Sequence, residues 1–240
     1  ERLFDPRELL GYTDEEWQFL QNQMICDLNE GYAIYRPRYI LPDYNVYIKK
    51  GCEFLELPPP KDLDEVLDGL LILYSHVPSI TTFPVYIGRL DMLLDPFITD
   101  EEQDYIKIKR FLNHVDKTVP DSFCHANIGP YDTKAGHLIL KAVIELEAPT
   151  PNMTIRYDKS KTSREFAELA AKACLLVSKP SFANDAYYIS DLGEQYGIAS
   201  CYNALPECGG AYTLTRLRLG TIARACKTVD EMINEQIGRA

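Results

Sequence analysis

The sequence lacks several features that would assign it to a common class of protein. It has no run of 18 apolar residues, so it predicts no membrane-spanning helix and no membrane partner. It has 25 Lys and Arg residues against 36 Asp and Glu residues, which gives a formal net charge of -11. Such a charge repels a phosphate backbone unless basic residues gather on one face, and the sequence shows no such cluster. We therefore expect no nucleic-acid partner.

Paired cysteines are also absent. The seven cysteines are odd in number, form no Cys-x-x-Cys pair and have no matching histidine spacing; they stand at positions 26, 52, 124, 174, 201, 208 and 226. This pattern argues against a disulfide framework and against a structural zinc site, so we expect reduced thiols and no bound metal. The sequence has no charged-then-apolar leader, which predicts a cytoplasmic protein.

Helical and strand-like patterns alternate along most of the chain. Capping residues and apolar spacing predict helices over residues 13–31, 42–51, 62–78, 99–115, 133–147 and 163–177, and a last helix from Asp230. Branched and aromatic runs predict strands over residues 79–88, 122–128, 153–157 and 212–219, with an irregular segment over 182–196. This alternation predicts an α/β fold in which helical crossovers join parallel strands.

The segment 197–210, Gly-Ile-Ala-Ser-Cys-Tyr-Asn-Ala-Leu-Pro-Glu-Cys-Gly-Gly, combines an apolar run with residues that interrupt regular structure. The run leads into Cys201, and then Asn203, Pro206 and two glycines break the pattern. The sequence therefore predicts a buried strand that delivers one thiol to the tip of a loop. The alternative is an ordinary strand with a small buried cysteine, which is a common place for a free thiol.

Polar residues follow the predicted strands at positions where α/β folds bind ligands. His125 and Asn127 end one strand, Asn184 follows another, and Asn203 follows Cys201. We interpret these four residues as candidates for substrate binding. The alternatives are a core or loop histidine at 125 and turn-forming asparagines at 127 and 203.

Six blocks of sequence carry a resemblance to a known family. They are Ile-Cys-Asp-Leu-Asn-Glu-Gly (25–31), Arg-Pro-Arg-Tyr-Ile-Leu-Pro-Asp-Tyr (36–44), Pro-Val-Tyr-Ile-Gly-Arg-Leu-Asp (84–91), His-Ala-Asn-Ile-Gly-Pro (125–130), Ser-Lys-Pro-Ser-Phe-Ala-Asn (178–184) and the cysteine segment itself. In this order they resemble the first half of the YjjI family of glycyl radical enzymes, relatives of pyruvate formate-lyase. The resemblance extends from about residue 24 to the end of the sequence.

The resemblance implies a fold and a division of the chain. Glycyl radical enzymes have a ten-stranded α/β barrel built from two half-barrels. The chain is then the amino-terminal, incomplete half of such a barrel. Residues 1–60 form a helical and extended region, and residues 61–240 form the first half-barrel with the cysteine loop at 197–210.

The resemblance also implies a chemistry and partners. Cys201 matches the position of the cysteine that becomes a thiyl radical and takes a hydrogen atom from a small organic substrate. A radical S-adenosylmethionine activase with an iron-sulfur cluster installs the glycyl radical, so the chain itself binds no cofactor. Homodimers are usual in such enzymes.

The sequence departs from the superfamily at three places. Ser200 precedes Cys201 where pyruvate formate-lyase has a second cysteine, which disfavours direct acyl transfer to coenzyme A. Asn203 occupies the position of a glutamate base, and an amide cannot act as a general base. The Arg-Val-x-Gly-Tyr signature of the radical glycine is absent, and Gly220, in Arg-Leu-Arg-Leu-Gly, is not a match because no Tyr follows.

These departures leave alternatives open. We expect the chain alone to be inactive, and the missing initiator Met and the uncapped final helix predict a fragment of an active parent enzyme. One alternative is a non-catalytic module that docks to a separate chain carrying the radical. Another is an enzyme in which His125 activates Cys201 as a nucleophile.

Overall fold

The computed structural model describes residue 7 and residues 11–27, 39–81, 85–118, 124–147, 150–199, 203–211 and 215–237. The chain divides into two compact units, residues 36–211 and, together, residues 1–35 and 212–240. The sequence predicts a boundary between residues 60 and 61, whereas residues 36–60 belong to the larger unit. The predicted catalytic residue Cys201 lies outside the described residues.

A four-stranded parallel sheet forms the centre of the larger unit, in the order β3-β4-β5-β6. Its strands are β3 (Val85–Arg89), β4 (Cys124–Ile128), β5 (Asn152–Tyr157) and β6 (Ser181–Asn184). The helices α6 (Glu101–Thr118), α7 (Lys134–Leu146) and α8 (Arg164–Val177) connect them in turn. The predicted α/β arrangement with helical crossovers is therefore confirmed.

Side-chain caps fix where these helices begin. Thr133 accepts a hydrogen bond from the Gly136 N–H at the start of α7, and Ser163 accepts one from Phe166 at the start of α8. Asp62 caps α4 (Leu63–Ile80) in the same way. The sequence predicts an end of α4 at Pro78, but the helix continues for two more residues, to Ile80. A proline in the last turn removes only one backbone hydrogen bond, so it does not stop the helix at once.

The two faces of the sheet differ in polarity, because successive side chains of a strand point to opposite faces. One face contributes apolar side chains to the main core beneath the helices: Val85, Ile87, Cys124, Ala126, Ile128, Met153 and Ile155. The opposite face, called the inner face below, carries Tyr86, His125, Asn127, Thr154 and Arg156, all buried. Polar groups at such depth need hydrogen-bond partners, and a second layer supplies those of Asn127 and Arg156.

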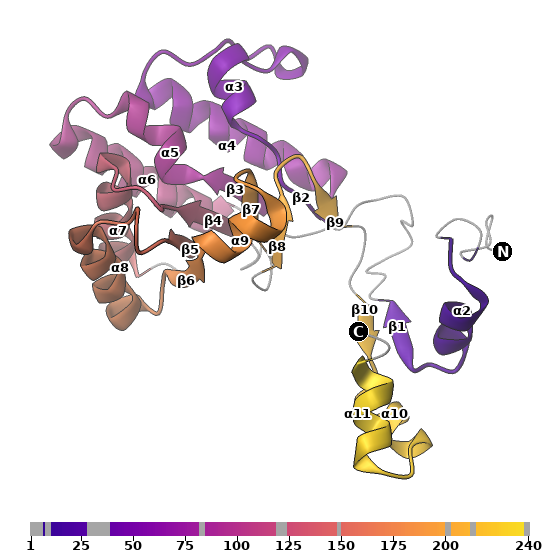
Figure 1. The fold of residues 1–240 in the computed structure, drawn as a ribbon. Coiled ribbons are helices and arrows are strands. Elements are labelled where there is room, and N and C mark those ends of the chain that lie inside the picture. The colour runs from indigo at the N-terminus through magenta and orange to yellow at the C-terminus, as the bar shows by residue number, and fades with distance from the viewer. Residues whose placement is uncertain are drawn as a thin grey trace. The chain divides into compact units, whose positions relative to one another are not determined.

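This second layer is an antiparallel hairpin of β7 (Tyr196–Ala199) and β8 (Asn203–Pro206), with Ala199 paired to Asn203. Figure 1 shows the hairpin and α9 (Asp185–Leu192) beside the sheet, away from the crossover helices. The sequence predicts irregular structure over 182–196 and after Cys201, and both predictions are wrong. Asn184 caps α9 by accepting from the Tyr187 N–H, and the cross-strand ladder keeps 203–206 extended.

The remaining elements of the larger unit are short. They are β2 (Tyr39–Ile40) paired with β9 (Gly210–Ala211), the helices α3 (Asn45–Lys50) and α5 (Leu90–Leu94), and the 3-10 turns η1 (Glu53–Leu55) and η2 (Asp95–Phe97). Tyr39, Leu41, Tyr86 and Ala199 form a second, small apolar cluster. It packs Tyr86 of the inner face against the end of β7.

The smaller unit contains α2 (Asp14–Gln21), β1 (Ile25–Asp27), β10 (Thr215–Leu217), α10 (Leu219–Ala225) and α11 (Val229–Ile237). Thr13 and Glu16 form the predicted capping box of α2. The predicted continuation of this helix to Gly31 is wrong, because Gln23 adopts a positive φ of 55° and residues 25–27 pair with β10. No helix among the described residues is long and apolar enough to cross a membrane.

Candidate functional site

Arg156 is the largest fully buried side chain of the inner face, and it holds the start of β7. Its Nη1 donates to the carbonyl oxygen of Tyr196 at 3.2 Å, and its Nη2 donates to that of Glu194 at 3.2 Å. The guanidinium also lies 3.9 Å from the ring centroid of Tyr196. The backbone of β7 is therefore attached to β5 through one side chain.

Asp185 balances the charge of Arg156. Its Oδ1 accepts from Arg156 Nε at 2.7 Å and from the Tyr196 hydroxyl at 2.9 Å, and Lys161 Nζ lies 3.1 Å from its Oδ2. Burial alone would raise the pKa of Asp185, but the hydrogen bonds and charge of Arg156 hold this pKa below its ordinary value. The carboxylate is therefore ionised at neutral pH.

Asn127 makes the second attachment of β7. Its Nδ2 donates to the carbonyl oxygen of Ile198 at 2.9 Å, and its Oδ1 accepts from the Ile198 N–H at 2.7 Å. The Tyr86 hydroxyl also donates to this Oδ1 at 3.3 Å. The amide thus satisfies both backbone groups of Ile198 as a neighbouring strand would.

The two attachments give the direction of β7 across the sheet. Asn127 is paired with Thr154, which places Arg156 two residues further toward the carboxyl end of β5. Tyr196, the first residue of β7, is bonded to Arg156, near the carboxyl end of the sheet strands. Ile198, two residues later, is bonded to Asn127, which lies nearer their amino end. The strand runs antiparallel to β4 and β5, and His125 lies two residues further along the same face of β4.

His125 is buried, with 5% of its surface exposed, and its Nε2 atom has no hydrogen-bond partner in the described part of the chain. Burial lowers the pKa of His125 to about 4, because a charged imidazolium loses its hydration there. The side chain is consequently neutral at neutral pH. It presents an unused ring nitrogen beside Tyr86 of β3, with which it is paired.

The buried histidine predicts a pH dependence of stability. Unfolded His125 takes up a proton below pH 6.5, whereas the folded residue takes one up only near pH 4. Stability relative to a non-titrating His125→Asn variant should therefore fall by about 3 kcal/mol as the pH drops from 6.5 to 4, and stay constant below that. Urea unfolding of both proteins across this range measures the difference.

The prediction concerns the difference in stability between the parent and His125→Asn, because Asp91 changes the stability of both proteins with pH in the opposite direction. Burial raises the pKa of Asp91 to about 6, so its contribution to stability grows as the pH falls through the same range. Asp91 is present in both proteins and cancels. His76→Asn, at an exposed histidine of α4, is the control for replacing a histidine by asparagine. Parallel pH curves for the parent and His125→Asn would contradict the prediction.

The other two predicted substrate-binding residues occupy different surroundings. Asn184 is exposed, caps α9 through its Oδ1 and also lines a cavity. Asn203 is exposed at the first position of β8, across the hairpin from Ala199. The structure therefore brings His125 and Asn127 onto one strand face and leaves Asn184 and Asn203 at the edges. Their roles in substrate binding stay predictions.

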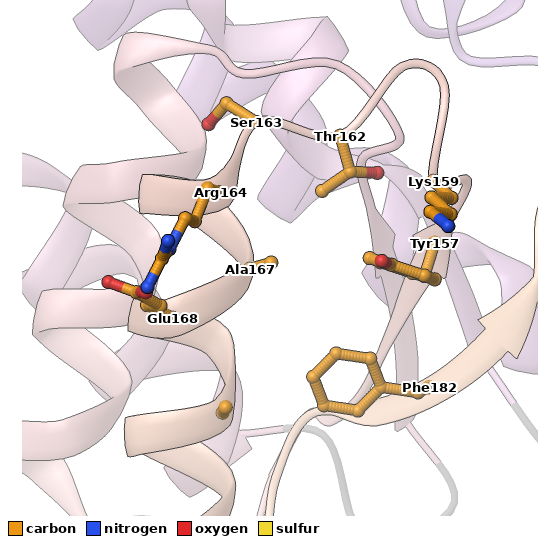
Figure 2. Close-up of a pocket in the computed structure, with 9 residues that line it drawn as sticks. Tyr157, Lys159, Thr162, Ser163, Arg164, Ala167, Glu168 and Phe182 are labelled. Atoms are coloured by element: carbon orange, nitrogen blue, oxygen red, sulfur yellow. The ribbon is translucent and has the colours of Figure 1, made fainter.

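Two cavities open beside β6. The inner-face cavity, of about 450 Å³, is lined by Thr154, Ser181, Phe182, Ala183, Asn184, Tyr187, Tyr188 and Ile198. The second, called the α8 cavity, has about 550 Å³ and lies between α8 and the loop after β5. Figure 2 shows Tyr157 and Lys159 across from Ala167 of α8, with Phe182 below them. Of these two cavities, the inner-face cavity contacts β7, through Ile198.

The sequence interpretation missed Arg156 and Asp185. An arginine inside the strand-like run Met-Thr-Ile-Arg-Tyr is a signal, because arginine is almost never fully buried unless it is paired. Its partner is 29 residues away and belongs to a segment with no predicted structure. No group of three His, Cys, Asp or Glu side chains in the described ranges is arranged to hold a metal ion.

Comparison with known proteins gives the family. The family model for glycyl radical enzyme YjjI-like proteins matches residues 3–240. The chain belongs to the YjjI-like family of glycyl radical enzymes. It is 45% identical over 221 residues to the Escherichia coli (strain K12) protein YjjI, covering 91% of the chain and 43% of that protein. It is 91% identical over 239 residues to an uncharacterized Haemophilus influenzae protein, covering the whole chain and 46% of that protein.

This YjjI-like chain thus spans less than half the length of these two relatives. Its fold is shared with a solved structure, the anaerobic ribonucleotide reductase from Thermotoga maritima with citrate in the active site. The TM-score is 0.64 at 12% sequence identity, and the match covers 95% of this chain and 51% of the reductase chain. The similarity supports the predicted α/β fold.

Proposed function

We propose that this chain is the part of a YjjI-like glycyl radical enzyme that carries the hydrogen-transferring cysteine, Cys201, and one wall of the substrate site. The observation that supports this most strongly is the attachment of β7 across a polar, buried sheet face by Asn127 and Arg156. Three residues separate the paired Ala199 and Asn203, and Cys201 is the middle one. A hairpin whose base is fixed in this way suits a reacting group that must be held in one position.

The proposed step is a hydrogen-atom transfer in two stages. A glycyl radical elsewhere in the complete polypeptide takes the hydrogen atom of the Cys201 thiol, which restores a glycine C–H bond and leaves a thiyl radical. The thiyl radical takes a hydrogen atom from a carbon of the substrate, which restores the thiol and leaves a substrate radical. One bond breaks and one forms in each stage, and the unpaired electron is conserved.

The inner face suits this chemistry because a radical reacts with whatever it meets. Tyr86, His125, Asn127 and Arg156 are all at most 5% exposed, so the floor beneath the hairpin excludes water. The hydroxyl of Tyr86 is already donated to Asn127. Burial also raises the pKa of Tyr86, which keeps this phenol protonated.

The nucleophile alternative gains less support. A catalytic base works best with a pKa near the working pH, and burial lowers that of His125 to about 4. His125 would then extract a proton from a thiol only weakly at neutral pH. In the docking alternative the radical glycine belongs to a separate chain, whereas in the main proposal it belongs to the same polypeptide. The experiment below distinguishes the two.

Activation of the complete polypeptide tests the proposal. The full coding sequence is expressed without oxygen together with a radical S-adenosylmethionine activase, the partner that we propose, and the electron paramagnetic resonance spectrum is recorded. We expect a carbon-centred radical signal from the complete polypeptide and none from the 240-residue chain. We also propose a homodimer, which sedimentation of the same sample measures.

Two outcomes count against the proposal. A signal that requires a second, separately encoded polypeptide with the radical glycine supports the docking alternative. No signal under any activation condition, combined with rapid alkylation of Cys201 at neutral pH, supports the nucleophile, because an activated thiolate reacts faster than a neutral thiol.

A further inference from the structure

The inner-face cavity is the part of the site whose chemistry bears on the substrate. Thr154 and Ser181, which pair with each other across the sheet, line its floor, and Thr154 pairs on its other side with Asn127. Ile198, the residue that Asn127 holds, closes one side. The cavity is therefore continuous with the attachment of the hairpin that leads to the proposed reacting thiol.

The lining of this cavity carries no charged side chain among the described residues. Its polar members are hydroxyl and amide groups from Thr154, Ser181, Asn184, Tyr187 and Tyr188. The aromatic rings of Tyr187 and Tyr188 lie edge to face at 5.4 Å between centroids, and Phe182 provides a third ring. Hydroxyl and amide groups offer both donors and acceptors, while the rings offer apolar contact to C–H groups.

The nearest cations are already committed to other groups. Arg156 uses its Nε on Asp185 and its two terminal nitrogens on the carbonyl oxygens of β7 and the residues before it. Lys161 bridges Asp185 and Asp158, at 3.1 and 3.3 Å. Withdrawing either cation toward a ligand would deprive the fully buried Asp185 of one of its two counter-charges.

Arg89 of β3 has a buried Nε without a hydrogen-bond partner in the described part of the chain, but it does not line this cavity, and β3 lies two strands away from Thr154 of β5 in the sheet. His125, on the neighbouring strand, is neutral at neutral pH because of its burial. An anionic ligand would thus lose hydration without gaining a charged partner, whereas a neutral ligand would exchange hydrogen bonds to water for hydrogen bonds to the lining.

We propose that the substrate of this site is an uncharged compound with several hydroxyl groups, of the polyol class, rather than a carboxylate or a phosphate ester. The inference rests on the proposed function for the identification of the site as catalytic. The hydroxyls of the ligand pair with those of Thr154, Tyr187 and Tyr188, and its C–H groups lie on the aromatic rings. This arrangement exposes a C–H bond next to a hydroxyl group, which is the kind of bond that a thiyl radical attacks.

The test compares ligands that share a carbon skeleton and differ in charge. The probes are glycerol, erythritol and ribitol, against glycerate, erythronate and ribonate. Binding to the complete, unactivated polypeptide is measured by saturation-transfer NMR and calorimetry. We expect at least one polyol to bind at least about tenfold more tightly than its carboxylate counterpart, a difference of about 1.4 kcal/mol.

Variants then assign the binding to the cavity. Thr154→Val and Tyr188→Phe each remove one hydroxyl from the cavity lining, and each should weaken the binding of the preferred polyol about tenfold, with circular dichroism of both variants to check that the fold is retained. Lys159→Met, in the α8 cavity, removes a charge elsewhere and should leave binding unchanged. Equal or tighter binding of the carboxylates, absence of binding by every polyol, or insensitivity to both cavity variants would overturn the proposal.

This test is independent of the test of the proposed function. Ligand binding is measured without the radical, so a failure of the polyols leaves the resonance signal unaffected. Conversely, if no radical signal is detected, a measured preference of the cavity for uncharged ligands remains valid.

Discussion

Cys201→Ser is expected to leave the radical signal of the activated, complete polypeptide intact and to lower its turnover at least about 10⁵-fold. The reason is the strength of the bond that must be broken and remade. A carbon radical readily takes hydrogen from an S–H group, whereas the O–H bond of serine is far stronger. A barrier increase of about 7 kcal/mol already lowers a rate about 10⁵-fold at 25 °C. Turnover per spin, measured on the same sample, gives the ratio.

The control for this substitution is a second cysteine of the same part of the chain. Cys208 lies just beyond β8, is exposed and has no role in the proposed transfer. Cys208→Ser should therefore retain both the radical and the turnover. Substantial turnover in Cys201→Ser, or its loss in Cys208→Ser, would show that a different group carries the hydrogen atom.

Arg156→Met is expected to destabilise the chain by about 3–5 kcal/mol, because it removes the buried partner of Asp185 and leaves this buried carboxylate with only the partly exposed Lys161. It also leaves the carbonyl oxygens of Tyr196 and Glu194 without their donor. Urea unfolding followed by circular dichroism measures this loss. We expect the variant to increase the hydrogen-exchange rate of the β7 amides more than that of the β4 and β5 amides. The hairpin loses a side chain that attaches it to the sheet, whereas β4 and β5 keep their backbone hydrogen bonds to each other.

Two further variants show whether the charge or the geometry matters. Arg164→Met removes an arginine of α8 whose side chain is 91% exposed, and it should leave stability nearly unchanged. Arg156→Lys keeps the charge but lacks the fork of donors that serves three acceptors, so its stability should lie between those of the parent and Arg156→Met. Equal stability of Arg156→Met and Arg164→Met would refute the proposed attachment.

The pattern of the sequence predicts those elements whose apolar periodicity is local. β4, β5, α7 and α8 lie where strand-like and helical periods predict them, and the caps at Thr133 and Ser163 fix two helix starts. Each of these elements contributes apolar side chains to the main core, so the spacing of its own apolar residues is enough to predict its secondary structure. The family resemblance is of the same kind, because it depends on the order of short blocks.

Local patterns fail where distant residues decide the conformation. The helix predicted to reach Gly31 ends early because residues 25–27 pair with residues 215–217, which lie far along the chain. The segment 182–196 contains β6 and α9, and its conformation depends on pairing with β5 and on the cap at Asn184. Neither contact leaves a periodic trace within the segment itself.

The sequence by itself determined the α/β class, the crossover helices and the family to which the chain belongs. Only the tertiary structure decided that one face of the sheet is polar and that Asn127 and Arg156 use this face to hold the hairpin. The physical reason is that Asn127 bonds a residue 71 positions later and Arg156 one 40 positions later. A buried polar group is stable only with its partner, and only the folded chain brings the two together.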